Sequence, residues 1–357
     1  MLFTIVTGTR PNLVKAAPLI REFEKQGLNY HFIHTGQHYD VTMFRNILKD
    51  LEMPKPSCDF GVFTPDTVKR ISDIMFEFGK YANYNKPNMV IVFGDVDSSL
   101  AIALCANKLK IPLAHIEAGE RSGNRSMPEE INRILIDELS DYHFCSSTNA
   151  LWNLKSIDIK MWTASFGNLM LDQLRHILST QEEYAVKNEP YGILTLHRQE
   201  NVDDPEKLKL IMEMVGRISE RIIIYFPVHP RTRKQFGPGV KKHHGIIFDT
   251  PRLYSEFIRI LNNAEFIITD SGGVQVEASY LNIPTITLRN ETEWLDTVSN
   301  GSNVVIGNTE YLEFDDLKKA IDNILDGKWK QSSFKNMAEY NHNASENIVN
   351  ILKGLKL

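Results

Sequence analysis

The sequence has few cysteines, no surplus of basic residues and no long uncharged apolar run. Its three cysteines, Cys58, Cys105 and Cys145, form an odd and widely spaced set, which argues against a disulfide framework or a zinc site. Their apolar neighbours predict that Cys105 and Cys145 are buried thiols. The formal net charge of −5 argues against a general nucleic-acid binder, so no nucleic-acid partner is expected.

The sequence also lacks a recognisable membrane or export segment. No stretch is both apolar and long enough to span a bilayer, so no membrane partner is expected. The first residues, MLFTIVTGTRP, soon become polar and have no basic lead, which predicts a strand rather than a signal peptide. We therefore expect a cytoplasmic protein.

Short apolar runs alternate with longer amphipathic segments, which is the pattern of βα units around parallel sheets. At 357 residues the chain is long enough for two such α/β domains. In the first half, strands are predicted at Leu2–Val6, Tyr30–His34, Asn88–Phe93, Leu113–Ile116 and Asp141–Cys145, with helices at Asn12–Gln26 and Ser98–Leu109. In the second half, strands are predicted at Gly192–Leu196, Ile222–Pro227, Ile246–Phe248, Phe266–Thr269 and Thr285–Leu288, with helices at Asp204–Ile218 and Tyr254–Asn262. The halves meet near Trp162–Asp172, and Ser332–Leu357 is predicted to be helical.

Ligands of open α/β sheets bind beyond the carboxyl ends of the strands, and acidic residues stand at two such ends. Asp95 follows Gly94 after the third strand, and Glu117 ends the next strand. A single acid at a strand end is more often a helix cap or an ion-pair partner, and Asp97 or Ser98 can cap the following helix. Two acids on neighbouring ends favour chemistry, because like charges in one cleft raise a pKa.

A third acidic segment runs from Met127 to Arg133. A proline followed by two glutamates fits the first turn of a helix, where carboxylates interact favourably with the helix dipole. Helix geometry places Glu129 and Arg133 four residues apart on one face. The residues alone leave open whether this pair is structural or functional.

Two glycine-containing turns are candidates for binding phosphate. After the first strand, Gly8 precedes a helix with Arg10 and Lys15, although an ordinary βα turn with surface cations explains this segment equally well. The stronger candidate is Thr269–Glu277, in which Ser271, Gly272 and Gly273 stand between a strand and a helix, and Glu277 is placed to accept hydrogen bonds from ribose. Neither turn is the G-x-G-x-x-G dinucleotide motif, so no nicotinamide cofactor is expected.

Histidines follow two strands of the second half. His197 is placed to donate a proton or to contact phosphate, whereas His229, between Pro227 and Pro230, reads as a loop-shaping residue. No compact metal-ligand spacing such as H-E-x-x-H is present, so no metal is expected.

These motifs, in this order, resemble the non-hydrolysing UDP-N-acetylglucosamine 2-epimerases. The matching stretches span nearly the whole chain: TGTRPNLVKAAPL, HTGQHYD, FGDVDSSLA, HIEAGERSGNRSMPEEINR, TLHRQENVDDP, PVHPRTR and TDSGGVQVEASYLNIPTITLRNETEW. The resemblance implies two Rossmann-like domains facing across a cleft, as in glycosyltransferase-B enzymes. It implies an N-terminal domain at residues 1–168 with the catalytic carboxylates, a UDP-binding domain at 169–340, and a C-terminal helix at 341–357 that packs back on the first domain.

The resemblance also implies roles for the candidate residues and the partners. The carboxylates of Asp95, Glu117 and Glu129 become the catalytic acids, with His197 beside them. Contacts to the UDP-sugar are implied for Arg10, Lys15, Arg133, His197, Ser271, Gly272, Gly273 and Glu277. The implied partners are a UDP-sugar and a second copy of the chain, as a homodimer. A second, regulatory UDP-sugar site of some relatives is not expected, because Gln37–Asp40 lacks the full pattern.

The implied reaction inverts carbon 2 of UDP-N-acetylglucosamine through loss and return of UDP. Thr292–Trp294 and the run RSMPEE resemble more closely the branch that acts on UDP-2,3-diacetamido uronic acids, so that sugar is an alternative substrate. Other readings are a UDP-sugar glycosyltransferase of the same fold, a hydrolysing relative that releases N-acetylmannosamine, and a nucleotide-sugar sensor without turnover.

Overall fold

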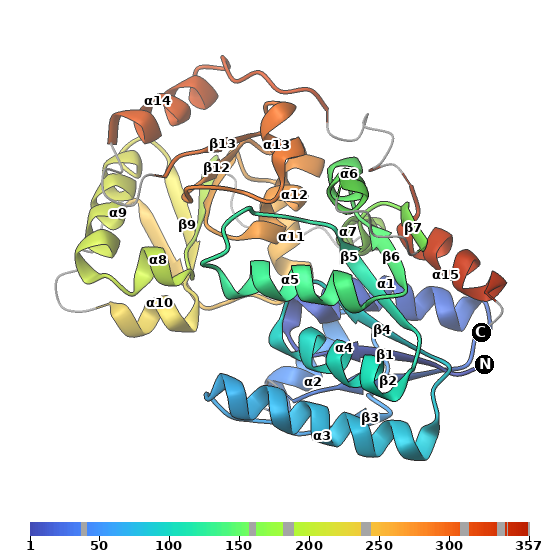
Figure 1. The fold of residues 1–357 in the computed structure, drawn as a ribbon. Helices are drawn as coiled ribbons and strands as arrows, with labels where there is room; N and C mark the ends of the chain where they lie inside the picture. Colours follow the sequence, from blue (N-terminus) through green and yellow to red (C-terminus); the bar gives the residue numbers. More distant parts are fainter. Residues whose placement is uncertain are drawn as a thin grey trace. The chain divides into compact units, whose positions relative to one another are not determined.

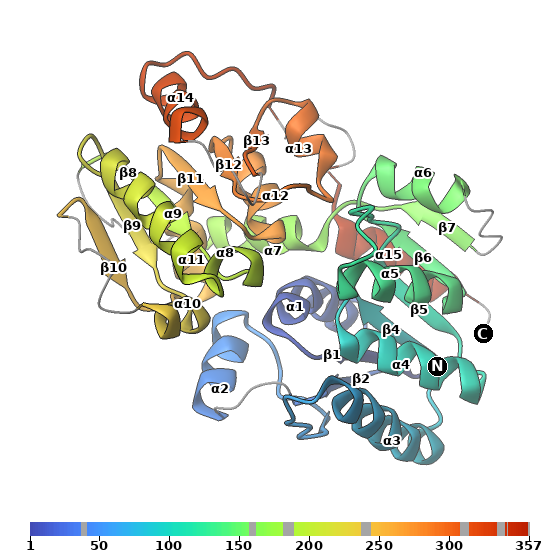
Figure 2. The same ribbon diagram turned by 60° about the vertical axis from the view of Figure 1, so that its left-hand side comes forward.

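The computed structural model describes residues 1–36, 41–156, 162–180, 189–236, 244–307, 314–333, 340 and 342–355. The chain forms two compact units, which are described separately. Unit 1 comprises Met1–His176 together with Ala338–Leu357, and unit 2 comprises Ile177–Met337. The predicted fold class, two α/β domains, is confirmed by a parallel sheet in each unit (Figures 1 and 2).

Unit 1 is built on a seven-stranded parallel sheet in the order β3-β2-β1-β4-β5-β6-β7. The central strands are buried on both faces, which explains why they read as continuous apolar runs. The strands are β1 (Phe3–Thr7), β2 (Tyr30–His34), β3 (Cys58–Asp59), β4 (Met89–Phe93), β5 (Leu113–Ala118), β6 (Tyr142–Cys145) and β7 (Trp162–Ser165).

Helices cover both faces of this sheet, with α3, α4 and α5 side by side on one face (Figure 1). Cys105 and Cys145 are buried, as predicted. The helices of unit 1 are α1 (Arg10–Lys25), α2 (Val41–Asp50), α3 (Thr67–Asn85), α4 (Asp97–Leu109), α5 (Pro128–Leu139), α6 (Thr148–Ser156), α7 (Leu169–Ser179) and α15 (Ala344–Gly354). The end of α7 extends into unit 2.

The C-terminal helix α15 belongs to unit 1 and packs against α1 (Figure 1). Its first-turn N–H groups, those of Ala344 and Ser345, donate to the carboxylate of Asp172 at 3.3 and 2.7 Å. This carboxylate fixes the start of the helix, because the first N–H groups of a helix need an acceptor. The helix predicted over Ser332–Leu357 is therefore too long, and Ser332, Ser333, His342 and Asn343 are not helical.

Unit 2 is built on a six-stranded parallel sheet in the order β10-β9-β8-β11-β12-β13. One face of this sheet packs with α9 and α14 into a single apolar core. The strands are β8 (Tyr191–Thr195), β9 (Ile223–Pro227), β10 (Ile246–Asp249), β11 (Phe266–Thr269), β12 (Thr285–Thr287) and β13 (Asn303–Val305). The helices are α8 (Gln199–Val202), α9 (Pro205–Ile218), α10 (Pro230–Gln235), α11 (Tyr254–Asn262), α12 (Gly272–Tyr280), α13 (Leu295–Ser299) and α14 (Phe314–Leu325).

The division of the chain falls at residue 176, eight residues beyond the domain boundary of 168 expected from the sequence. The reason lies in α7, where Gln173 and Arg175 bond to other residues of unit 1. Gln173 accepts a 2.5 Å hydrogen bond from Arg21 of α1, and Arg175 donates to the backbone of Tyr340 and His342 at 3.1 and 2.8 Å.

The strand order reverses once in each sheet, between β1 and β4 in unit 1 and between β8 and β11 in unit 2. Such a switch point opens a crevice beyond the carboxyl ends of the two strands, and ligands of open α/β sheets bind there. The carboxyl ends of these strands are therefore the expected ligand-binding edge of each sheet.

Candidate active site

The carboxylate of Asp95 lies just beyond β4, at the switch point of unit 1, and forms an ion pair with Arg133. Arg133 comes from α5, is 6% exposed, and also pairs with Glu130 at 3.3 Å. The neighbouring Asn132 donates from Nδ2 to the backbone oxygen of Asp95 at 2.8 Å. Helix α5 therefore holds Asp95 by both its side chain and its backbone.

The capping role expected of Asp97 is not what the structure shows. Val96 is the N-cap residue of α4, and Asp97 is the first helical residue. Its carboxylate pairs with Arg70 of α3 at 2.6 Å and accepts from Asn132 at 3.1 Å. These contacts tie the turn that carries Asp95 to both α3 and α5.

Glu117 occupies a strained position at the end of β5. The register between β5 and β6 shifts between Ile116 and Ala118, so Glu117 is the extra residue of a bulge. Its backbone φ is 68°, in the left-handed region that a glutamate enters only at a cost of about 1–3 kcal/mol. Bulges of this kind re-aim a side chain, and here the Glu117 carboxylate meets Lys15 with an Oε2–Nζ distance of 2.5 Å.

Lys15 lies on α1, is 7% exposed, and sits between the ends of β4 and β5. A Cβ added to Gly94 would lie 3.3 Å from Lys15 Nζ and 3.8 Å from Glu117 Oε1. The glycine at position 94 therefore leaves the room that this ion pair occupies. The structure brings Lys15 and Glu117 together beside the turn that carries Asp95.

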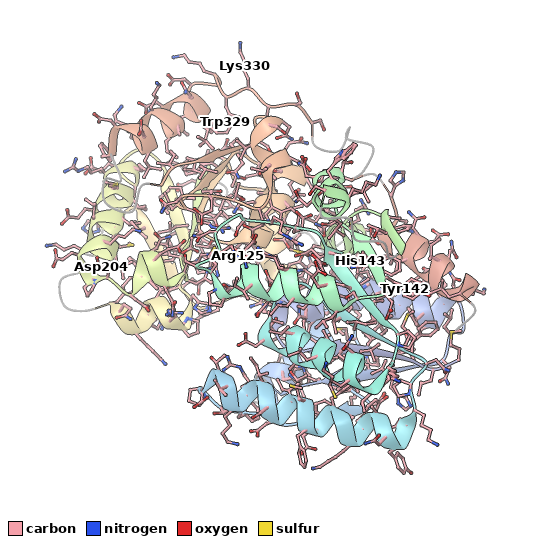
Figure 3. All side chains as sticks on the ribbon, in the orientation of Figure 1. Arg125, Tyr142, His143, Asp204, Trp329 and Lys330 are labelled. Atoms are coloured by element: carbon pink, nitrogen blue, oxygen red, sulfur yellow. The ribbon has the colours of Figure 1, made fainter. Side chains whose placement is uncertain are left out.

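Two neighbouring acids in the first turn of α5, Glu129 and Glu130, differ in burial. Glu129 is exposed in the first turn of α5, after the loop in which Figure 3 labels Arg125. Glu130 is 2% exposed and accepts hydrogen bonds from the backbone N–H groups of Ser122 and Gly123 at 2.8 and 3.2 Å. Glu130 is therefore a loop anchor, whereas Glu129 is the acid of this pair that can meet a ligand.

Glu120 is a buried acid that the sequence reasoning missed. It is 2% exposed, and its Oε1 accepts from the hydroxyls of Ser146 and Ser147 at 2.5 and 3.0 Å. Burial raises the pKa of Glu120 to about 8, and the charge of Glu117 acts in the same direction. This carboxyl therefore holds a proton at neutral pH.

The turn after β1 is organised mainly by Asn12. The Oδ1 of Asn12 accepts from the backbone N–H groups of Gly8 and Thr9, both at 3.3 Å, and forms a capping box with Thr9. Two of the N–H groups that were expected to serve an anion are therefore used within the turn. Arg10, half-buried, is the first residue of α1.

At the switch point of unit 2, His197 and Asp270 form a paired site across the ends of β8 and β11. The Nδ1 of His197 lies 2.8 Å from Oδ1 of Asp270, and the backbone N–H groups of His197 and Arg198 donate to Oδ2 at 2.9 and 3.0 Å. Burial alone would raise the pKa of Asp270, but the hydrogen bonds and charge of His197 and these backbone donors hold it below its ordinary value. The carboxylate therefore fixes a proton on Nδ1 and orients the imidazole.

The phosphate turn predicted at Thr269–Glu277 begins α12 immediately after β11. Ser271 is the N-cap residue without a side-chain cap, and Gly272 and Gly273 form the first turn. A Cβ on Gly272 would lie 2.5 Å from Glu293 Oε1, so the segment containing Glu293 lies against this turn. Arg289 pairs with the same glutamate at 2.8 Å and balances its charge.

Glu277 is 2% exposed within α12, and its Oε1 accepts a 2.6 Å hydrogen bond from the hydroxyl of Tyr254. The sequence reasoning predicted Glu277 as a ribose contact but missed Tyr254, because the two residues meet only through the packing of α11 on α12. His229 is the N-cap of α10 and accepts from the N–H of Arg231 at 3.2 Å, which agrees with a loop-shaping role.

Comparison with known proteins identifies the family to which a chain with this arrangement belongs. The family model of the UDP-N-acetylglucosamine 2-epimerases matches residues 21–353. This chain belongs to that family.

Relatives within the epimerase family match most or nearly all of the chain. A UDP-N-acetylglucosamine 2-epimerase of Methanocaldococcus jannaschii is 38% identical over 371 residues, with 99% of each chain covered. A UDP-2,3-diacetamido-2,3-dideoxy-D-glucuronate 2-epimerase of Pseudomonas aeruginosa is 36% identical, with 86% of this chain and 88% of that one covered. The crystal structure of the M. jannaschii UDP-GlcNAc 2-epimerase in complex with UDP-GlcNAc and UDP matches with a TM-score of 0.89 at 37% identity, covering 99% of each chain.

Two further properties concern only the residues that the structure describes. Among them, no group of three or more histidine, cysteine, aspartate or glutamate side chains is arranged to hold a metal ion. Each helix in the described part of the chain is too short or too polar to cross a bilayer. The segment Gln37–Asp40, in which no regulatory site was expected, lies outside the described residues.

Proposed function

We propose that this chain inverts carbon 2 of UDP-N-acetylglucosamine to give UDP-N-acetylmannosamine, by eliminating UDP and adding it back. Membership of the epimerase family supports the reaction class. The observation that carries the proposal is the pair of acids at the ends of neighbouring strands, Asp95 against Arg133 and Glu117 against Lys15. Each acid is next to a cation that stabilises its charged form.

The reaction requires elimination because the hydrogen on carbon 2 is not acidic. No carbonyl is adjacent to carbon 2, so a carbanion there would have no stabilisation. Carbon 1, however, carries UDP, which departs with the electron pair of the C1–O bond as the proton leaves carbon 2. The product is 2-acetamidoglucal, and return of the UDP oxygen to carbon 1, with a proton arriving on the opposite face of carbon 2, completes the inversion.

This chemistry needs a base and an acid on opposite faces of the sugar ring. In the proposal, Asp95, Glu117 and Glu129 share these proton transfers. Arg133 and Lys15 stabilise the carboxylates and the charge that develops on the departing diphosphate. All five residues belong to unit 1.

The nucleotide is proposed to bind to unit 2 with a contribution from Arg10. The N-terminus of α12 at Ser271–Gly273 offers backbone N–H groups and a positive dipole end to the diphosphate. His197, oriented by Asp270, adds a donor, and Glu277 accepts from the ribose hydroxyls.

A 2,3-diacetamido uronic acid is the second candidate sugar. The relative from P. aeruginosa carries that activity in its name, and Thr292–Trp294 lies against the Gly272 turn. Thr292 donates to Gln275 at 2.6 Å, so this segment is held in place beside the proposed diphosphate site. Turnover assays with each UDP-sugar as the substrate distinguish the two candidates.

We further propose a cytoplasmic homodimer. Helix α3 exposes three large apolar side chains, Val68, Phe76 and Tyr84, at 79%, 64% and 87%. Covering them in a contact between two copies would remove apolar surface from water. Sedimentation equilibrium measures the mass of the native assembly. The mass of a monomer, measured at micromolar protein concentration, would contradict the proposed homodimer.

The decisive experiment is proton NMR of the purified protein with UDP-N-acetylglucosamine alone in deuterated water, without added nicotinamide. An epimerase incorporates deuterium at carbon 2 and forms the manno isomer. Release of UDP and free N-acetylmannosamine identifies a hydrolysing enzyme. Binding without exchange is the result expected of a sensor or of a glycosyltransferase that lacks its acceptor. A glycosyltransferase gives no exchange without an acceptor.

The carboxylates are tested in the same assay. We expect Asp95→Asn, Glu117→Gln and Glu129→Gln each to lower kcat about 10²- to 10⁴-fold, the range for loss of a general acid or base. UDP affinity, which rests on unit 2, is expected to stay within a few-fold of that of the unaltered protein. Near-normal turnover of all three variants contradicts the assignment.

A further inference from the structure

A buried polar cluster beneath the two acid-bearing strand ends is not used by the proposed mechanism. Its centre is Asp137, a residue of α5 that is 1% exposed, and its closest partner is His115 of β5, which is fully buried. The Nδ1 of His115 lies 2.7 Å from Oδ1 of Asp137. Neither side chain is exposed to solvent, and the partners described below all belong to unit 1.

The cluster reaches the end of β4 through His115. The Nε2 of His115 lies 2.9 Å from the backbone oxygen of Gly94, the residue immediately before Asp95. Gly94 has a φ of 58°, and its N–H donates to the oxygen of Ile116 at 2.9 Å. The imidazole thus fixes the peptide that leads into Asp95.

The cluster reaches the end of β5 through the second oxygen of Asp137. Oδ2 accepts from the N–H of Gly119 at 3.2 Å, two residues after Glu117, and pairs with Arg121 at 2.6 Å. Gly119 has a φ of 82°, so the chain turns sharply just after the bulge. The backbone of Asp137 is held as well, because its oxygen accepts from Nε2 of His143, labelled on β6 in Figure 3, at 2.7 Å.

Both ring nitrogens of His115 face oxygens of other groups. A carbonyl oxygen can only accept, and so can the carboxylate of an ionised Asp137, so with Asp137 ionised both ring nitrogens donate. Burial would raise the pKa of Asp137, but the charge and hydrogen bonds of His115 and Arg121 hold it below its ordinary value. With Asp137 ionised, the two residues form a buried ion pair in the core of unit 1.

Burying two charges is costly, and apolar side chains of similar size often stabilise a core as well or better. Its hydrogen bonds to the backbone of Gly94 and Gly119 give this ion pair a role that apolar side chains could not fill. We propose that Asp137 and His115 are positioning residues that set the spacing of the Asp95 and Glu117 carboxylates, by fixing Gly94 and Gly119. This inference rests on the proposed function for its effect on turnover.

The test compares Asp137→Asn and His115→Gln with the unaltered protein. We expect kcat to fall about 10- to 100-fold in both variants, the loss typical of a small displacement of catalytic groups. KM and UDP affinity are expected to change less than about threefold, because the lost interaction acts in the transition state. A uniform loss of affinity and activity together, or unchanged kcat, overturns the proposal.

Asp172→Asn is the matched control. Asp172 is also a buried carboxylate of unit 1, but its two oxygens accept hydrogen bonds from the N–H groups of Ala344 and Ser345 at the start of α15. We expect this variant to lose thermal stability comparably and to keep its kcat within about twofold. If Asp172→Asn lowers kcat as much as Asp137→Asn at equal stability, positioning is not the cause.

A readout without activity separates this inference from the proposed function. Nitrogen NMR of histidine-labelled protein near neutral pH, with His115→Gln to assign the signal, is expected to show both ring nitrogens of His115 protonated. In Asp137→Asn we expect a ring with one proton. A neutral His115 in the unaltered protein overturns the ion pair, whereas an enzyme that fails to exchange deuterium overturns the proposed function alone.

Discussion

Lys15 and Glu117 form a buried ion pair in which Nζ and Oε2 are 2.5 Å apart, and both side chains are about a tenth exposed. Leaving a buried carboxylate without its cation costs about 3–5 kcal/mol. We expect Lys15→Met to lower kcat by about 10²-fold or more, because Glu117 then either moves away or takes up a proton. Steady-state kinetics with the UDP-sugar measures the loss.

The control for this prediction is Lys25→Met on the same helix. Lys25 pairs with Glu22 at 3.1 Å, but its side chain is 66% exposed, so the pair contributes about 0–1 kcal/mol. The kcat of the Lys25→Met variant is expected to be unchanged. Equal effects of the two substitutions would mean that Lys15 acts only on the stability of α1.

The protonated carboxyl of Glu120 makes stability depend on pH. Its pKa rises from 4.5 to about 8 on folding, so between these values the folded state holds a proton that the unfolded chain has released. The free energy of unfolding therefore falls as pH rises through this window, by up to about 1.4 kcal/mol per pH unit from this group. Below 4.5 and above about 8 the contribution is constant.

Glu120→Gln removes this dependence while keeping an acceptor for Ser146 and Ser147. We expect the variant to gain stability relative to the unaltered protein as pH rises from 5 to about 8. Denaturant titrations at several pH values give the difference directly. A difference that stays flat across this range would show that Glu120 ionises normally.

Asp270 is predicted to govern nucleotide affinity through His197. Asp270→Asn removes the charge that fixes the proton on Nδ1 of His197, so the ring no longer presents a defined donor. We expect UDP to bind about tenfold more weakly, a loss typical of a charge-assisted hydrogen bond. Isothermal titration calorimetry measures the Kd, with Asp322→Asn, a surface residue of unit 2, as a variant that should bind normally.

Two glycines of one loop are predicted to differ sharply in their tolerance of alanine. Both Gly119 and Gly123 have positive φ, at 82° and 75°. A Cβ on Gly119 would lie 2.3 Å from the backbone oxygen of Ala150, whereas one on Gly123 would meet nothing within 4 Å. We expect Gly123→Ala to cost about 1 kcal/mol and Gly119→Ala about 3 kcal/mol or more. Chemical denaturation compares them, and equal losses would contradict the role of the Ala150 contact.

Local patterns were sufficient to predict many of the elements. Phe266–Thr269, Tyr254–Asn262 and Tyr30–His34 have the predicted bounds, because each is an apolar or amphipathic run enclosed by turn residues. The helix predicted from Ser332 was too long, since its start is set by Asp172, a residue far away in the sequence. Boundaries that depend on such distant partners are outside the reach of periodicity.

The same distinction applies to the candidate site. Asp95 and Glu117 were recognisable because they end strands of one parallel sheet. Asp137, Glu120 and Tyr254 were missed, because their partners come from other strands and helices and no spacing rule connects them. The one available signal for Asp137 was its place four residues after Arg133, on the same face of α5.

The docking of α15 on α1 has a consequence for how the chain folds during synthesis. The N-terminal sheet emerges first from the ribosome, but the last helix of its own unit emerges only after all of unit 2. The contiguous segment of unit 2 can therefore complete its fold while the nascent N-terminal unit still exposes the side of α1 that α15 covers. That apolar surface stays open to chaperones until the residues between α7 and α15 have been translated.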